Sequence, residues 1–155
     1  MPSDATEVTV NPLPSQPGAF TTSTSTVCQG TSNVIYTVPN DPTVTYTWNY
    51  SGSGATIAGS TNSVTVSYST SATSGTLSVT ASNSCGTSTA RTLSITVNAL
   101  PVVDAGTNQT IPHGTSTTLD ATVSGPGILS YSWTPEALLV NPDIVDPTTV
   151  NLSST

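Results

Sequence analysis

The chain has 155 residues, which is enough for one ordinary domain or for two small β-domains joined by a short linker. Its net charge is -7 at pH 7, only 6% of its residues are charged, and Arg91 is its one Lys or Arg. Binding to a phosphate backbone or to an anionic membrane surface draws on clusters of Lys and Arg, so this composition excludes both kinds of partner.

The apolar residues follow the period of a β-strand. They recur at every second position in stretches such as VTYTW (44–48), SVTVSY (63–68) and LSITV (93–97), as expected for strands with one buried face. We find no stretch with the 3.6-residue period of a helix, and no run long enough to span a membrane. The sequence therefore predicts a nearly all-β protein without direct membrane insertion.

The first part of the chain predicts an antiparallel sandwich. Gly, Pro, Asn and Ser clusters separate seven expected strands, which lie at 19–30, 33–38, 43–50, 56–59, 63–69, 75–83 and 91–98. Short strands at this regular spacing are typical of immunoglobulin-type sandwiches. Trp48 lies on the third expected strand, where such folds bury a Trp between the two sheets.

A second unit is expected after the Pro-containing boundary at 99–101. It supplies four expected strands, at 109–114, 116–125, 128–136 and 148–155. Trp133, in YSW, corresponds to Trp48, in YTW, 85 positions earlier, and we expect it in the second core. The stretch EVTVNPLP (7–14) likewise matches SITVNALP (94–101) at an offset of 87. Two matches at nearly the same offset predict tandem repeats of about 86 residues.

This register implies a chain that is out of phase with its repeats. We expect residues 1–11 to be the trailing strand of a preceding repeat, 12–98 a complete sandwich and 99–155 the N-terminal part of a second one, without its last two strands. Residues 5–11 should then extend freely or pair with another chain or with the open second unit. The expected partners are neighbouring repeats or chains of the same type.

The cysteines and the N-terminus suggest an extracellular setting. Cys28 and Cys85 are the only cysteines, and we predict a disulfide between them, with two separate thiols as the alternative. The start MPSDATEV has neither the basic region nor the apolar run of a signal peptide. We therefore expect a segment of a longer secreted protein.

The opening of the second unit, VVDAGTNQTIPHGTSTTLDATVSG followed by YSW, resembles the PKD (polycystic kidney disease) domain family. The match is carried by Asp104, Ala105, Gly106, Gln109, Thr110, Gly114, Leu119, Asp120, Tyr131 and Trp133. The family's Trp-Asp-Phe-Gly-Asp-Gly motif is absent. The stretch LLVNPDIVDPTTVN and the first unit are similar to PKD-like repeats of very large, type IX-secreted surface proteins of gliding bacteria.

The resemblance implies a non-catalytic stalk or spacer in a cell-surface adhesin or filament, with a role in adhesion or gliding. The alternative is a carbohydrate-binding accessory module of a secreted polysaccharide hydrolase, and surface polysaccharide is then the ligand. We expect no enzymatic activity, because the carboxylates lie mostly in expected turns and the only histidine, His113, lies in the turn IPHG.

The sequence also offers candidate calcium ligands and candidate sugar-stacking aromatic side chains. We expect no cofactor other than calcium. Calcium is a candidate because some PKD-like modules hold Ca²⁺ near a domain junction. Asp104, at the junction, and Asp143 with Asp146, in one loop, are the candidate ligands. Exposed aromatic side chains could instead stack on sugar rings. Tyr50, Tyr68 and an uncovered Trp133 are the candidates, with packing in the strands as the alternative for the tyrosines.

Overall fold

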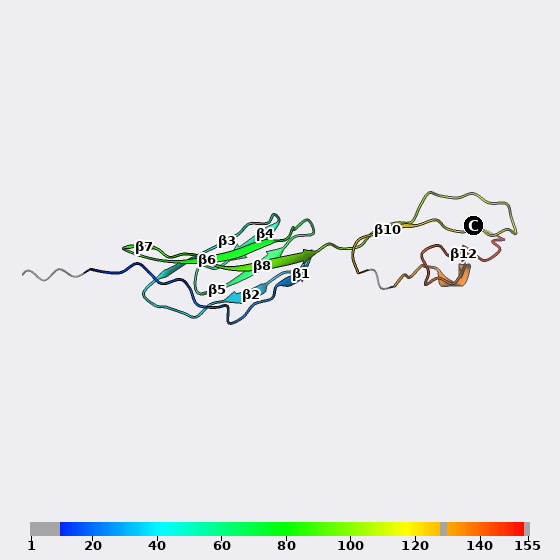
Figure 1. Ribbon diagram of the computed structural model, residues 1–155. Coiled ribbons are helices and arrows are strands. Elements are labelled where there is room, and N and C mark those ends of the chain that lie inside the picture. Colours follow the sequence, from blue (N-terminus) through cyan, green and yellow to red (C-terminus); the bar gives the residue numbers. More distant parts are fainter. Residues whose placement is uncertain (1–9, 128–129, 154–155) are drawn as a thin grey trace, which may run out of the picture. The chain divides into compact units, whose positions relative to one another are not determined.

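The computed structural model describes residues 10–127 and 130–153, and the chain divides into two compact units, Met1–Asn98 and Ala99–Thr155 (Figure 1). Most of the segment expected to be a trailing strand, residues 5–9, lies outside the described residues. Val10 and Asn11 are exposed and belong to no strand. Within the described part, no helix has the length and hydropathy of a membrane span.

The first unit is a two-layer β-sandwich, and each of the seven expected segments contains a strand. One sheet has the order β1-β8-β6-β3, with the short β7 beside β6, and the other has the order β2-β5-β4 (Figure 1). The bounds are β1 Thr26–Cys28, β2 Val34–Thr37, β3 Thr45–Tyr50, β4 Ala55–Ala58, β5 Ser63–Tyr68, β6 Gly75–Asn83, β7 Gly86–Thr87 and β8 Arg91–Asn98. The pairing is antiparallel throughout except between β1 and β8, which are parallel. This is the strand arrangement of an immunoglobulin-like sandwich.

The core lies between the two sheets, where the alternate residues of the strands meet. On β6, Leu77 and Val79 have no exposed surface and Ala81 is buried. They face buried side chains of the other sheet, which include Tyr36 on β2 and Val66 on β5. Among the described residues, every buried side-chain polar atom has a hydrogen-bond partner. The alternation visible in the sequence thus becomes one closed apolar layer.

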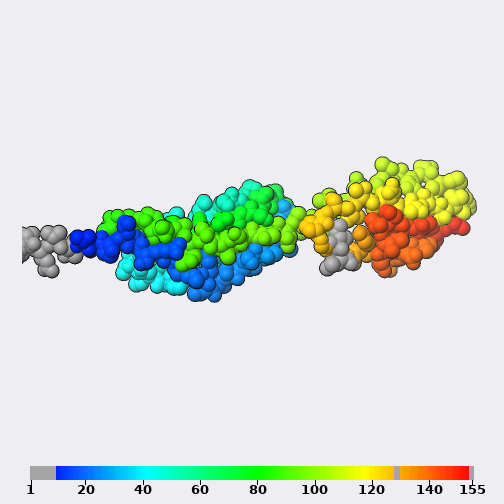
Figure 2. Space-filling model, viewed as in Figure 1, coloured from blue at the N-terminus to red at the C-terminus, as the bar shows by residue number. Residues whose placement is uncertain are grey.

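The segment that precedes β1, blue in Figure 2, first contacts the β6–β8 sheet through residues 12–17 and then bridges to β2 through Thr22 and Thr37. Its backbone carbonyls accept hydrogen bonds from two side chains: Asn83 Nδ2 donates to Pro12 O at 3.2 Å, and Arg91 Nε donates to Pro17 O at 3.0 Å. Arg91, the only Lys or Arg of the chain, therefore anchors the loop that contains Pro17.

The second unit builds only short pairings in its described residues. It contains β9 Val102–Asp104, β10 Thr122–Ser124, a 3-10 turn Glu136–Leu138, β11 Leu139–Val140 and β12 Thr148–Thr149. β9 pairs with β10, and β11 pairs with β12. Isolated antiparallel bridges also join Thr115 to Leu152 and Thr118 to Thr148. The segments 115–118, 148–152 and 139–140 therefore adjoin in the order of β2, β5 and β4 in the first unit.

Two strand predictions for the second unit are wrong. Residues 109–114 form no strand, although a bridge begins at Thr115, and no strand forms in the described part of 128–136, residues 130–136. In the first unit, β3 is an edge strand that pairs only with β6, residue for residue from Thr45 to Tyr50. No strand lies beside residues 130–133 among the described residues of the second unit. A strand exists only through its ladder, so this segment stays irregular.

Candidate functional site

Trp48 lies where its strand position requires, between the two parts of the first core. Its indole packs against both buried clusters and against Phe20, with ring centroids 6.1 Å apart. The ring remains partly exposed, and its Nε1 donates a hydrogen bond to Thr61 O at 2.9 Å. Both the ring carbons and the Nε1 of Trp48 therefore make contacts within the first unit.

The tyrosines proposed to stack on sugars belong to the core. Tyr68 is 2% exposed and contacts the edge of Tyr50, with ring centroids 5.7 Å apart, so the prediction of a stacking role for Tyr68 is wrong. The ring alternates inward on β5 with Val64 and Val66, which hides it behind β3. Tyr50 is partly exposed, but its hydroxyl donates to Thr73 O at 2.7 Å. These contacts favour packing over ligand binding.

Two buried tyrosine hydroxyls form a chain of hydrogen bonds. Tyr36 donates its proton to Thr24 O at 3.2 Å, and the Tyr36 and Tyr68 hydroxyls lie 3.0 Å apart, so Tyr68 donates to Tyr36. Burial raises the pKa of both groups, and the bond that Tyr68 donates raises its pKa further. Burial also raises the pKa of Tyr50. The cluster is held neutral, which suits a structural role.

The predicted disulfide between Cys28 and Cys85 is wrong, because both cysteines are free and exposed. Cys28 pairs with Asn98 at the end of β8, beyond the level of Gly75 on β6. Cys85 lies in the turn between β6 and β7, at the other end of the same sheet. At about 3.3 Å per residue, the two are on the order of 30 Å or more apart, whereas a disulfide needs Cα atoms within roughly 7 Å.

Two reactive thiols per folded chain are therefore expected. A thiol-specific reagent should label Cys28 and Cys85 without denaturant, because both are exposed. Cys28→Ser and Cys85→Ser should each remove one equivalent and change the free energy of unfolding by less than about 0.5 kcal/mol, as for other surface sites. A chain that reacted only after treatment with a reductant would contradict the free thiols.

The candidate calcium ligands are not gathered into a site. Asp104 Oδ1 accepts a hydrogen bond from Gly106 N at 3.0 Å, and Asp146 Oδ1 accepts one from Ala121 N at 3.0 Å, whereas Asp143 is exposed. Residues 10–127 and 130–153 contain no group of three or more His, Cys, Asp or Glu side chains that could hold a metal. Asp104 therefore holds a turn and Asp146 joins two segments distant in sequence, and calcium binding at Asp104, or at Asp143 with Asp146, stays a prediction.

His113 is an exposed residue of a turn, as the sequence indicates. Asp41 shows the same structural use of a carboxylate in the first unit. It accepts bonds from Thr43 N at 2.9 Å and Thr43 Oγ1 at 2.6 Å, and these bonds lower the pKa of its carboxyl group. His113 and Asp41 thus both belong to turns.

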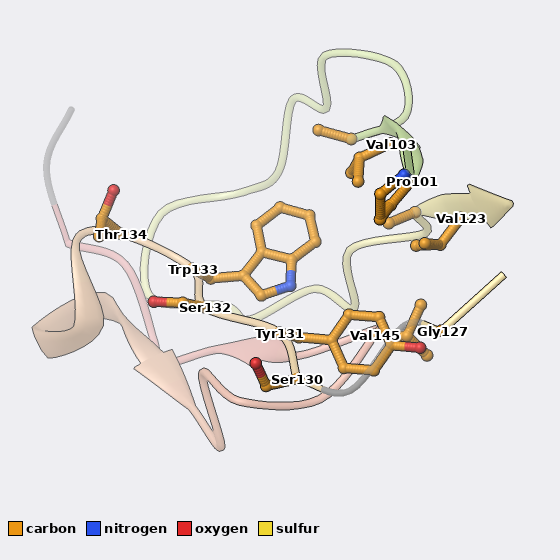
Figure 3. A pocket seen from close by; sticks show the side chains of 12 residues that line it. Pro101, Val103, Val123, Gly127, Ser130, Tyr131, Ser132, Trp133, Thr134 and Val145 are labelled. Carbon is orange, nitrogen blue, oxygen red and sulfur yellow. The ribbon is translucent and has the colours of Figure 1, made fainter. Parts of the chain in front are cut away.

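An apolar groove in the second unit is the strongest candidate for a binding surface. We call it the Trp133 groove, and its cavity volume is about 620 Å³. Figure 3 shows the indole of Trp133 projecting into it, and the groove is lined mainly by Pro101, Val103, Ala121, Val123, Tyr131 and Val145. Trp133 Nε1 donates to Ile144 O at 3.0 Å, and the ring is partly exposed.

Sequence reasoning identified Trp133 but missed the residues around it. Val103 and Val123 are opposite partners in the β9–β10 pair, so they share one face of that sheet. Tyr131 and Trp133 are two residues apart, which is the spacing of one face of an extended segment. The alternation of apolar and polar residues in TVSG and YSW indicated which side chains of each segment share a face. The pairing of β9 with β10 could not be read from it.

Comparison with known proteins bears mainly on the first unit. Residues 13–95, more than half of the chain, match the family model described as a PKD-like domain. Among solved structures, the chain is similar to the I-band fragment I67-I69 from titin, with 16% identity and a TM-score of 0.46 over 88% of this chain and 56% of that one. No curated protein matches the chain. The match over residues 13–95 shows that the chain belongs to the PKD-like domain family.

Proposed function

We propose that the chain is a non-catalytic structural segment of a larger, secreted cell-surface protein, in which PKD-like units act as stalk or spacer modules of an adhesin or filament. The localisation is extracellular, on a bacterial surface of the gliding-motility type. The composition supports this setting, because a chain with a single Lys or Arg offers a trypsin-like protease one residue to recognise.

The observation that carries the proposal is the parallel pairing of β1 with β8. β1 is the first strand of the first unit and β8 is the last, and Thr26, Val27 and Cys28 pair with Thr96, Val97 and Asn98. Because the strands are parallel, a pull on the two ends of the unit loads their hydrogen bonds in shear, and they must break together. Such an arrangement suits a spacer under tension.

A repeat structure for the whole chain is supported by the second unit. In both units the indole of the equivalent Trp donates to a backbone carbonyl, Trp48 to Thr61 and Trp133 to Ile144. The cross-strand hydroxyl pair of Thr37 and Ser63 likewise has a counterpart in Thr118 and Thr148. These parallels favour tandem units of one kind.

Force spectroscopy tests the spacer role. Stretching a single chain by its ends should unfold the first unit in one event and release roughly 200 Å or more, since each residue adds about 3.4 Å when extended. Gln29→Pro should lower the unfolding force, because it removes the bond from Gln29 N to Asn98 O at 2.9 Å. Gln29→Ala is the matched control, since it removes only the side chain. Equal forces for the two variants would refute the shear mechanism.

The carbohydrate-binding alternative is not favoured by the contacts of Tyr50 and Tyr68, but it has a direct test. Polysaccharide binding that is lost in Tyr50→Ala and kept in Tyr50→Phe, with both variants folded, would displace the purely structural function. The Phe variant retains the ring that would stack on a sugar and removes only the bond from the hydroxyl to Thr73 O.

A further inference from the structure

β3 is the longest strand at an edge of the described sheets. It spans six residues, Thr45–Tyr50, whereas the edge strands β1 and β4 span three and four residues. The outer side of β2 is partly occupied, because an antiparallel bridge joins Thr37 to Thr22. β3 pairs only with β6. One whole side of its backbone is therefore open in the part of the chain that the structure describes.

The register of the ladder identifies the open backbone groups. Just beyond β3, Ser51 N donates to Thr76 O at 3.0 Å, and these two residues continue the β3–β6 register as a hydrogen-bonded pair. Such pairs alternate along an antiparallel ladder. The odd-numbered residues of β3 therefore bond to β6. The N–H and C=O groups of the even-numbered residues point to the open side, and these residues are Tyr46, Trp48 and Tyr50.

The sequence of β3 has none of the features that usually protect a strand edge. Natural sheets protect their edges with charged side chains, prolines or bulges. Residues 45–50 contain no proline and no charged residue, and their pairing with β6 runs residue for residue without a bulge. The side chains on the outer face of β3 are exposed and uncharged: Thr45, Thr47 and Asn49. Such an edge is a template for another strand.

We propose that the open edge of β3 pairs with β3 of a second copy of the chain, antiparallel and about a two-fold axis at Trp48. Trp48 then faces Trp48 of the other copy, and Tyr46 of each copy faces Tyr50 of the other. In this register every outward N–H meets an outward C=O, because all of these residues carry both groups on the open side. The two sheets continue into one another through an isologous interface.

The side chains of β3 are self-complementary in this register. On the outer face, the two-fold axis places Thr47 opposite Asn49 of the other copy, and these short, uncharged side chains can hydrogen-bond to each other. On the inner face, the rings of Trp48 and Tyr50 are partly exposed in a single chain. Aromatic side chains that meet across a strand pair are among the favourable cross-strand contacts. Both faces of the strand therefore fit a second copy.

Charge also favours a second copy as the partner. Asp41 and Arg91 are the charged residues of 10–98, so this part of the chain has no net charge and two first units do not repel each other. The carboxylate of Asp41 already accepts two bonds from Thr43. A strongly charged partner gains nothing at this edge, whereas an uncharged strand does. The inference concerns contact between chains and holds whether or not the first unit bears tension.

Charged substitutions on the outer face of β3 test the partner and the register. Sedimentation of the full chain over a range of concentrations measures the dissociation constant of the dimer. Thr47→Glu with Asn49→Glu should raise it by roughly tenfold or more, because like charges then face each other across the axis. Thr47→Lys with Asn49→Glu should restore the dimer, since opposite charges then meet. The control is Thr92→Glu with Ser94→Glu, at exposed positions of β8, which should leave the constant unchanged.

Hydrogen exchange of single amides locates the contact in the unaltered chain. In dilute solution the amides of Tyr46, Trp48 and Tyr50 should exchange faster than those of the residues between them, which bond to β6. At concentrations where the copies associate, these three amides should slow by roughly tenfold or more. This measurement decides the matter even if the doubly acidic β3 variant does not fold, which its near-ultraviolet signal reveals.

Three results would overturn the proposal. They are a chain that stays monomeric at every concentration, a dimer that is weakened equally by the β3 and β8 substitutions, and a dimer that leaves the three amides of β3 unprotected. The last result would place the contact between copies elsewhere on the molecule. None of these results depends on unfolding forces, so the spacer function is tested separately.

Discussion

Ile95→Ala should lower the free energy of unfolding of the first unit by about 3 kcal/mol, within the usual range for such truncations in a packed core. Ile95 is 2% exposed and packs in the cluster with Tyr36, Val66 and Leu77. β8 is held between β1 and β6, so the sheet cannot collapse easily into the space that is left. Urea denaturation followed by the near-ultraviolet signal of the buried tyrosines measures the change.

Ile35→Ala is the matched control for this experiment. The substitution is the same and also lies on a strand of the first unit, but Ile35 is 52% exposed on β2. Its cost should stay below about 1 kcal/mol, the span of strand propensity. Similar losses at the two positions would mean that the core is not closed between the sheets at Ile95.

The first unit should also lose roughly 1 to 3 kcal/mol of stability as the pH rises from about 10 to about 11. In the folded chain the pKa values of Tyr36 and Tyr68 are raised above the ordinary value near 10, mainly by burial. Their contribution is therefore complete below about pH 10, where the unfolded chain is also protonated, and it is lost as the pH rises further. The slope is about 1.4 kcal/mol per pH unit for each tyrosine that stays protonated only in the folded state.

The composition of the chain makes it simpler to assign this loss of stability at alkaline pH to tyrosines. The chain has no lysine, so no lysine side chain contributes to the slope near pH 10. Denaturation midpoints at several pH values, combined with tyrosinate absorbance, give the slope. Tyr68→Phe should reduce the slope by roughly 1.4 kcal/mol per pH unit. An unchanged slope in that variant would show that Tyr68 ionises equally in the folded and unfolded chains.

Most of the first unit could be predicted from local patterns. The alternation in SVTVSY and LSITV and the Gly, Pro and Asn clusters between strands predict all seven strands, because a half-buried strand imposes a period of two on its own sequence. Trp48 was placed on the correct strand by the same reasoning. The sequence could not show that Tyr68 packs behind Tyr50. Alternation tells which residues share a face of a strand, but not which face the other sheet covers.

The failures come from contacts that are distant in sequence. An even cysteine count says nothing about distance, and Cys28 and Cys85 lie at opposite ends of one sheet. The candidate calcium ligands also have other partners, because Asp104 accepts a bond from Gly106 N in its own turn and Asp146 accepts one from the distant Ala121 N. The strand expected around Trp133 does not form, although its sequence pattern matches that of β3.

The sequence by itself determined the all-β class, the strands of the first unit and the repeat of the Trp motif, because side-chain alternation and turn residues act over a few neighbouring positions. Only the tertiary structure decided which side chains meet: the parallel β1–β8 pair, the neutral tyrosine cluster and the groove beside Trp133. The physical reason is that a strand is completed by its neighbours. β3 has β6 across its whole length, whereas residues 130–133 have no such partner among the described residues.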